Sequence, residues 1–209
     1  PALRQYFFRY RQYYYNNRKQ MKTSKLQILF SLIIFSFGYS QIEQINKIDS
    51  IYDKKTEEIP VKNKTSKKYW KYASEINSSR IAEYDKILNQ IYQKDSAEIP
   101  ELKPQTEDKI ISYKNNGIGG FRNDISKNID LTEHPYLPNL IGTTLKTELK
   151  WIVDENGMIK KVEAKGENEA FNTLSKIALY KTSGNWIPAQ KEGNNIKSSF
   201  RFPIISQID

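Results

Sequence analysis

Few residues in this 209-residue chain have types and spacing suited to catalysis or to metal binding. The chain has no cysteine and one histidine, His134, which stands in Thr132-Glu133-His134-Pro135. Without cysteine, a cysteine nucleophile, a thiolate metal site and a disulfide scaffold are excluded. His134 has no nearby nucleophile and no carboxylate with a defined role, so we expect a loop histidine. The sequence therefore predicts no catalytic residue, no metal ligand and no cofactor.

Two glycine-containing motifs resemble ligand loops but lack the residues that such loops need. Gly117-Ile118-Gly119-Gly120 is followed by no Lys-Ser/Thr pair and preceded by no strand pattern, so it is not expected to cradle a phosphate. Asp154-Glu155-Asn156-Gly157 has its glycine too early for a calcium loop, and a distal Glu is missing at the required spacing. Asn-Gly readily supplies the positive φ of a tight turn, so we expect a hairpin turn here.

The charge of the chain is concentrated at its beginning. The formal net charge is +9, from 33 Lys+Arg and 24 Asp+Glu. Residues 1–40 hold seven basic side chains and no acid, which leaves 26 basic and 24 acidic side chains, a net of +2, in residues 41–209. No helix-turn-helix or zinc module accompanies the charge. We therefore expect no nucleic-acid partner.

Residues 21–40 have the layout of a secretory signal peptide. Lys22 and Lys25 precede a short apolar run from Leu26 to Phe37, and small residues flank Tyr39 before Gln41. The run is shorter than the roughly 20 residues that span a bilayer, which favours a cleaved signal over a retained membrane anchor. Residues 1–20 interleave aromatic and basic side chains and could form an RNA-binding arm. Upstream sequence translated through a misplaced start is the preferred interpretation, with a mature chain from about Gln41 in the periplasm or secreted.

Residues 41–115 carry two helical patterns in a polar, lysine-rich background. Apolar residues recur every three to four positions from Ile42 to Tyr52, and again from about Ser74 to Lys94. Pro60 and the lysine-dense residues 61–71 separate the two patterns, and Pro100 ends the second. We expect a helical or linker region whose apolar stripes are packing faces, although its high charge is also compatible with partial disorder.

Residues 116–209 predict an α+β domain. A short helix pattern runs from Phe121 to Ile129, and strict alternation marks a strand from Leu145 to Val153. A second strand over 158–165 would complete a hairpin, which an amphipathic helix over 167–181 would cover. A last strand is expected over 196–202, with Pro203 closing it. The predicted order is α-β-β-α-β, with a small antiparallel sheet and helices on one face.

The residues at the joints of this pattern resemble those of the TonB C-terminal domain family. The resemblance covers about 90 residues and depends on order and spacing, because no single motif is specific. The matching positions are Gly119-Gly120-Phe121, Asn128, Pro135, Pro138, Gly142, Val153-Asp154, Gly157, Trp186-x-Pro188, Gly193 and Phe202-Pro203-Ile204.

The resemblance implies a periplasmic domain that binds an extended segment of an outer-membrane transporter by adding it to a sheet edge. Carried over by position, that edge is 197–202, with Lys197, Ser199 and Arg201 facing a partner protein or peptide. The same edge could also pair two copies of the chain.

Two departures from the family separate this chain from its energy transducers. The apolar run looks cleavable, and residues 41–115 lack the long proline-rich linker of the family. A non-enzymatic, exported binding protein is therefore the favoured function. A membrane-anchored energy transducer and an envelope enzyme of unrecognised type are the alternatives.

Overall fold

The structure is a computed structural model, and it describes residues 41–102 and 106–209. The predicted upstream segment 1–20 and the predicted signal 21–40 lie outside the described residues. Residues 41–209 form one compact unit. After a helix over 41–57, the elements in chain order are α2 (Lys67–Glu98), β1 (Ser112–Tyr113), α3 (Gly117–Asn128), the 3₁₀ turns η1 (Leu131–Glu133) and η2 (Leu137–Asn139), β2 (Thr144–Val153), β3 (Ile159–Gly166), α4 (Glu169–Tyr180), β4 (Trp186–Ile187), β5 (Ala189–Lys191), β6 (Asn194–Ile196) and β7 (Ser198–Gln207).

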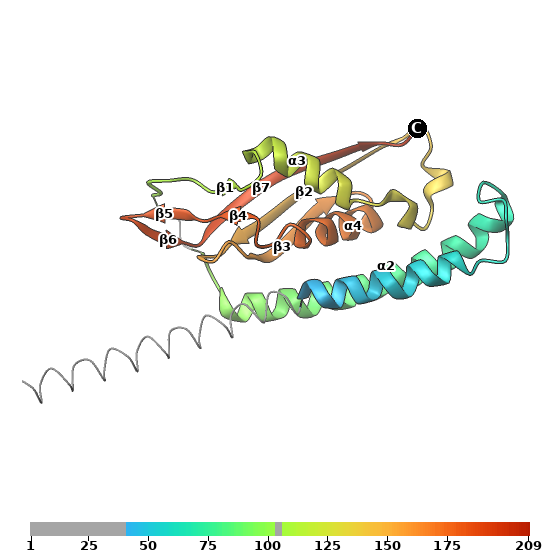
Figure 1. Cartoon of the computed structure of the whole chain (residues 1–209), viewed down its shortest axis with the longest axis horizontal. Helices are drawn as coiled ribbons and strands as arrows, with labels where there is room; N and C mark the ends of the chain where they lie inside the picture. The colour runs from blue at the N-terminus through green and yellow to red at the C-terminus, as the bar shows by residue number, and fades with distance from the viewer. Residues whose placement is uncertain (1–40, 103–105) are drawn as a thin grey trace, which may run out of the picture. The chain divides into compact units, whose positions relative to one another are not determined.

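The main sheet has three antiparallel strands in the order β3-β2-β7, so β2 is central and the other two strands are edges. α4 packs on β2 and β3, and α2 packs on α4 and β3, as Figure 1 shows. The opposite face of the sheet carries exposed polar side chains such as Lys146 and Lys150. The predicted α+β class, with its α-β-β-α-β order and helices on one face of an antiparallel sheet, is confirmed.

The predicted hairpin between β2 and β3 is present, and its glycine cannot be replaced without strain. Gly157 has φ +78°, and a Cβ there would lie 2.3 Å from the carbonyl oxygen of Trp186. Asp154 Oδ1 accepts the N–H groups of Asn156 and Met158, both at 2.9 Å. The turn is therefore fixed both by its own hydrogen bonds and by its packing on Trp186.

An aromatic cluster fills the space between the sheet and α3. Trp186, which is 2% exposed, meets Trp151 at a ring-centroid distance of 5.3 Å and Phe121 at 4.9 Å. Phe200 and Phe202 of β7 contact the same group, at 5.1 Å from Trp151 and 5.2 Å from Phe121. Aromatic residues bury large areas, so this cluster ties β7 and α3 to the rest of the core.

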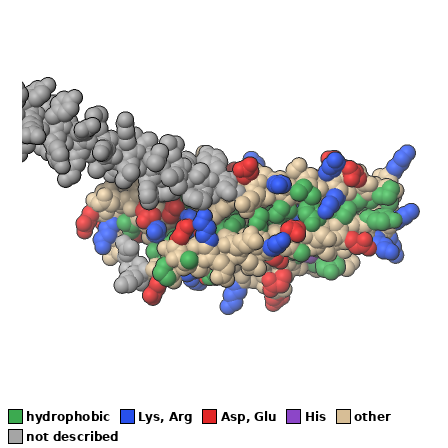
Figure 2. Space-filling view, turned by 90° about the horizontal axis from the view of Figure 1, so that it is seen from below, with side chains coloured by type: hydrophobic (Ala, Val, Ile, Leu, Met, Phe, Trp, Pro, Cys, Tyr) green, Lys and Arg blue, Asp and Glu red, His purple; other side chains and the backbone are tan. Residues whose placement is uncertain are grey.

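The two N-terminal helices are part of the same core. Ile45, Tyr84, Leu88 and Ile91 are buried in one cluster with the sheet residues. β1 pairs with β4, so residues before 116 also contribute to the C-terminal fold. α2 is longer than the predicted helix 74–94: Ser66 caps its N-terminus by accepting the N–H of Tyr69 at 3.1 Å. Figure 2 shows this side of the molecule, where acidic and basic side chains are interspersed.

Candidate functional site

The feature best suited to function is the free edge of β7. Ile208, directly after β7, donates its N–H to Thr143 O at 3.0 Å and accepts the N–H of Gly142 at 2.8 Å. Its main chain therefore faces the β2 side. Successive residues of a strand point their N–H and C=O groups to alternate sides. The main-chain groups of the even-numbered residues of β7 therefore point toward β2. The main-chain groups of the odd-numbered residues, from Ser199 to Gln207, face away from the sheet.

The predicted end of the last strand was wrong. β7 continues through Pro203 to Gln207, and Pro203 pairs with Glu148 of β2 in register. Pro203 is odd-numbered, so its missing N–H is one that would have pointed away from β2. A proline in that position costs the sheet no ladder hydrogen bond. The edge is consequently ten residues long rather than the predicted run over 197–202.

The three predicted partner-binding residues lie at this edge but do not form one row on the strand. Ser199 and Arg201 are exposed on β7, on the open face of the sheet. Arg201 Nη1 lies 3.5 Å from Glu148 Oε1. Lys197 precedes β7, is only partly exposed, and its Nζ lies 3.6 Å from Glu155 Oε1. A strand added to β7 would therefore meet the main chain of Ser199 and Arg201, and their side chains would flank it on one face.

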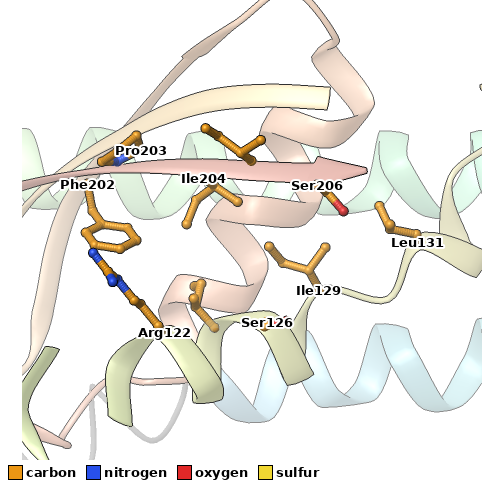
Figure 3. Close-up of a pocket in the computed structure, with 10 residues that line it drawn as sticks. Arg122, Ser126, Ile129, Leu131, Phe202, Pro203, Ile204 and Ser206 are labelled. Carbon is orange, nitrogen blue, oxygen red and sulfur yellow. The ribbon is translucent and has the colours of Figure 1, made fainter. Parts of the chain in front are cut away.

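A groove runs between α3 and β7, on the helix-covered side of the sheet. It has a volume of about 500 Å³ and is lined mostly by apolar side chains. Figure 3 shows Phe202 and Ile204 pointing from β7 toward α3, with Arg122 extended toward the ring of Phe202. The guanidinium carbon of Arg122 is 5.6 Å from that ring centroid. No ion pair joins Arg122 to a carboxylate of the described residues, so the groove offers an apolar wall and one available cation.

The sequence did not predict this groove or the second half of the edge. Ile205, which is 65% exposed, and Gln207 belong to the edge, and Ile129 and Leu131 line the groove. Two adjacent β-branched residues at 204 and 205 were a signal for a continuing strand. No local signal shows that residues near 125 lie beside residues near 204.

The opposite edge of the sheet is covered by α2. Asp95, which is 0% exposed, accepts the main-chain N–H of Lys161 on β3 at 2.7 Å. Lys160 Nζ lies 3.5 Å from Asp95 Oδ1 and 3.2 Å from Glu98 Oε2. Burial raises the pKa of Asp95, and the Lys161 N–H and the Lys160 ammonium oppose that rise. Lys161 has φ +50°, so the strand bends at the point where the helix meets it.

A cluster of linked ionisable side chains around the buried Arg80 and Tyr84 joins the N-terminal helices to the C-terminal part. The Arg80 guanidinium, 2% exposed, lies 2.5 Å from Glu133 Oε1 and 2.7 Å from Asp53 Oδ1. Tyr84 Oη donates to Asp49, whose other oxygen lies 2.8 Å from Lys181 Nζ. Burial raises the pKa of Glu133 to about 7, against the opposing pull of Arg80. Each side chain of this cluster forms an ion pair or a hydrogen bond with another member. The cluster is therefore explained by its structural role, which is to attach the N-terminal helices to η1 and to the end of α4.

His134 also holds elements together. It is 1% exposed, follows η1, and its Nδ1 accepts the N–H of Tyr136 at 3.1 Å. Since Nδ1 is the acceptor, Nε2 carries the proton and donates to Asn168 Oδ1 at 2.9 Å. Asn168 Oδ1 also caps α4 by accepting the N–H of Phe171. Burial lowers the pKa of His134, so the ring is neutral at pH 7.

The fold and its edges define a small α+β protein in which a helix covers one edge of the main sheet and no described residue pairs with the other edge. Among the described residues, no cluster of three or more His, Asp or Glu side chains is arranged to hold a metal ion. None of the helices in the described part is long and apolar enough to cross a membrane. No family model, curated protein or solved structure matches the chain.

Proposed function

We propose that this protein binds an extended segment of a partner polypeptide as an added strand along β7. The observation that carries the proposal is the row of outward main-chain groups on β7, from Ser199 to Gln207, which no hydrogen bond of the described residues uses. An exposed edge of this kind is a template for pairing with another chain. Main-chain hydrogen bonds would supply affinity, and flanking side chains would supply selectivity.

The groove between α3 and β7 supports this proposal because it lies directly beside the free edge. A strand paired with β7 would place alternate side chains on the groove side. Ile125, Ile129 and Leu131 provide an apolar wall for them, and Arg122 can pair with a carboxylate. The partner segment therefore carries apolar side chains at alternate positions and an acidic residue that reaches Arg122.

The place of action in this proposal is the envelope of a cell, outside the cytoplasm. The support is the signal-like sequence over 21–40 and the resemblance of residues 116–209 to the TonB C-terminal domain family. An outer-membrane transporter is the partner that this resemblance favours. Mass spectrometry of the mature protein tests the location: a first residue at Gln41 supports export with cleavage, and an intact segment 21–40 contradicts it.

Site-specific photo-cross-linking in the native envelope tests the edge. A photoreactive amino acid at Ile205 should cross-link to a partner, and one at Lys165 of β3, on the open face at the opposite edge of the sheet, should not. The product should disappear in Ser199→Pro, which removes an outward N–H, and persist in Ser199→Ala, which keeps it. A product of twice the chain mass would identify a second copy as the partner. Equal yields from Ile205 and Lys165, or an unchanged yield in Ser199→Pro, would contradict the proposal.

A further inference from the structure

Positive charge is concentrated in the turn between the two N-terminal helices and in the first turn of α2. Residues 61–71 hold five lysines and no acidic residue. The rest of residues 41–209 holds 21 basic and 24 acidic side chains, a net of −3. Figure 2 shows basic side chains gathered at the right-hand end of the molecule, where this turn lies, with apolar side chains beside them. We call residues 59–72 the basic tip; its lysines are Lys62, Lys64, Lys67, Lys68 and Lys71.

The lysines of the basic tip are exposed and make no ion pair with the described residues. Their neighbours on the preceding helix differ in this respect. Lys54 Nζ lies 4.0 Å from Glu58, and Lys55 Nζ lies 4.2 Å from the ring centroid of Tyr52. The positive charge of the tip is therefore not balanced within the part of the chain that the structure describes.

Fold stability does not account for this charge. Lys67 and Lys68 lie in the first turn of α2, which contains no acidic residue. The N-terminal turn of a helix disfavours positive charge, because the N–H groups there already carry a partial positive charge. Like charges at close spacing also repel one another. An arrangement that costs stability and remains exposed is better explained by an external anionic partner.

Apolar side chains are interspersed with the lysines. Trp70 is partly exposed and stands three residues after Lys67, so these two side chains are neighbours on the helix surface, and Lys71 is a neighbour of Lys67 on the next turn. Tyr72 is 38% exposed. A hollow of about 430 Å³ lies beneath the turn, and Ile59, Pro60, Val61, Lys62, Lys64 and Tyr69 are among its lining residues. Thr56 and Glu57 complete the lining, so the hollow is of mixed polarity. The tip thus combines cations with a partly exposed aromatic ring and a small hollow that has an apolar side.

We propose that the basic tip docks on the surface of a membrane that contains anionic lipids. Lysines near such a surface are attracted by its negative potential, each by on the order of fivefold in partitioning. Trp and Tyr favour the interface between headgroups and acyl chains, where one part of the ring is apolar and the other is wet. A sulfated polysaccharide would use the lysines but not the apolar side chains, and a nucleic acid could stack its bases on the rings but would leave Ile59, Pro60 and Val61 unused. This docking is independent of strand addition at β7, which lies elsewhere on the fold.

Vesicle co-sedimentation of residues 41–209, which form a compact unit with their own core, tests the proposal. Vesicles of phosphatidylcholine with phosphatidylglycerol should bind the protein, and vesicles of phosphatidylcholine alone should not. Binding should weaken as salt is raised. Trp151 and Trp186 are already 0% and 2% exposed, so a blue shift of tryptophan fluorescence on binding reports on Trp70.

A triple variant and a matched control separate the tip from overall charge. Lys64→Gln/Lys67→Gln/Lys68→Gln should reduce binding to the anionic vesicles about a hundredfold. Lys127→Gln/Lys146→Gln/Lys165→Gln removes the same charge from exposed positions elsewhere and should reduce binding less than about fivefold. Thermal unfolding of both variants establishes that they remain folded.

Three results would overturn the proposal. These are equal losses in the two triple variants, equal binding to vesicles with and without phosphatidylglycerol, and binding to heparin or DNA without binding to the anionic vesicles. The last result would assign the tip to a soluble polyanion. None of them bears on the cross-linking at β7, so the two proposals can fail separately.

Discussion

Along β3, the outward N–H of Lys161 meets the buried carboxylate of Asp95, whereas along β7 the outward N–H groups meet no acceptor among the described residues. The covered edge uses a 32-residue helix, a buried acid and the ion pairs of Lys160. On the free edge, Pro203 removes one outward N–H group, and Arg201 forms an exposed ion pair with Glu148. Natural sheets normally protect their edges against pairing. Within residues 41–102 and 106–209, a helix and a buried acid meet one edge, and the outward main-chain groups of the other edge have no hydrogen-bond partner, which suits that edge to strand addition.

The largest effect is expected at the covered edge. Asp95→Ala would leave the N–H of Lys161 without its acceptor and Lys160 without its buried partner. Breaking a buried pair by removing one member costs about 3 to 5 kcal/mol in the free energy of unfolding. Urea denaturation measures this loss. Glu98→Ala removes the more exposed partner of Lys160 and should cost less than about 1 kcal/mol, so similar losses in both variants would contradict the importance assigned to Asp95.

A pair of serine substitutions distinguishes the two sides of β7. Ser206→Pro removes an N–H that faces β2 and should cost about 3 kcal/mol or more, since a ladder hydrogen bond is lost. Ser199→Pro removes an N–H that faces away and should cost less than about 1 kcal/mol. Thermal or urea unfolding of the two variants measures the difference. If Ser199→Pro proved as destabilising as Ser206→Pro, the alternation deduced from Ile208 would be wrong.

The contribution of His134 to the free energy of unfolding should depend on pH. His134 holds the segment that follows Leu131, a lining residue of the groove, and its folded-state pKa is lowered by burial. The unfolded chain therefore binds the proton more readily, so this contribution to stability is complete above about pH 6.5 and declines as the pH falls. The difference in the free energy of unfolding between wild type and His134→Gln should shrink from pH 7 to pH 5. A difference independent of pH would show that His134 does not titrate in this range.

The smallest effect is expected for Arg201→Ala. Arg201 and Glu148 have side chains that are 62% and 45% exposed, and exposed ion pairs contribute little to stability. The free energy of unfolding should change by less than about 0.5 kcal/mol, while the cross-linking yield from Ile205 changes if Arg201 flanks the partner. A larger loss of stability would mean that the free edge is itself supported by this pair.

The sequence predicts local structure well where one strong pattern is present. Strict alternation from Leu145 to Val153 gave β2 nearly to the residue, and Asn156-Gly157 gave the hairpin turn. The start of α2 was missed because the dense lysines of 61–71 look like a loop, although lysine is a good helix former and Ser66 is a good cap.

The candidate site was predicted only in part, because its other half depends on contacts distant in the sequence. Ser199 and Arg201 were correctly placed at an edge, since alternation and chain order suffice for that. Pro203 was misread because its effect depends on which side of the strand its nitrogen faces, which no local pattern shows. The cover on β3 joins Asp95 to Lys161 across 66 positions, so nothing in either segment alone indicates which edge is protected.

Pro203 divides the outward N–H groups of β7 into two equal pairs. Ser199 and Arg201 offer N–H groups on one side of it, and Ile205 and Gln207 offer them on the other. In any register, one carbonyl of a paired strand falls opposite Pro203 and stays without a donor. The row of hydrogen bonds that this edge can offer is therefore interrupted once near its middle, which disfavours indiscriminate growth of the sheet by copies of the same strand.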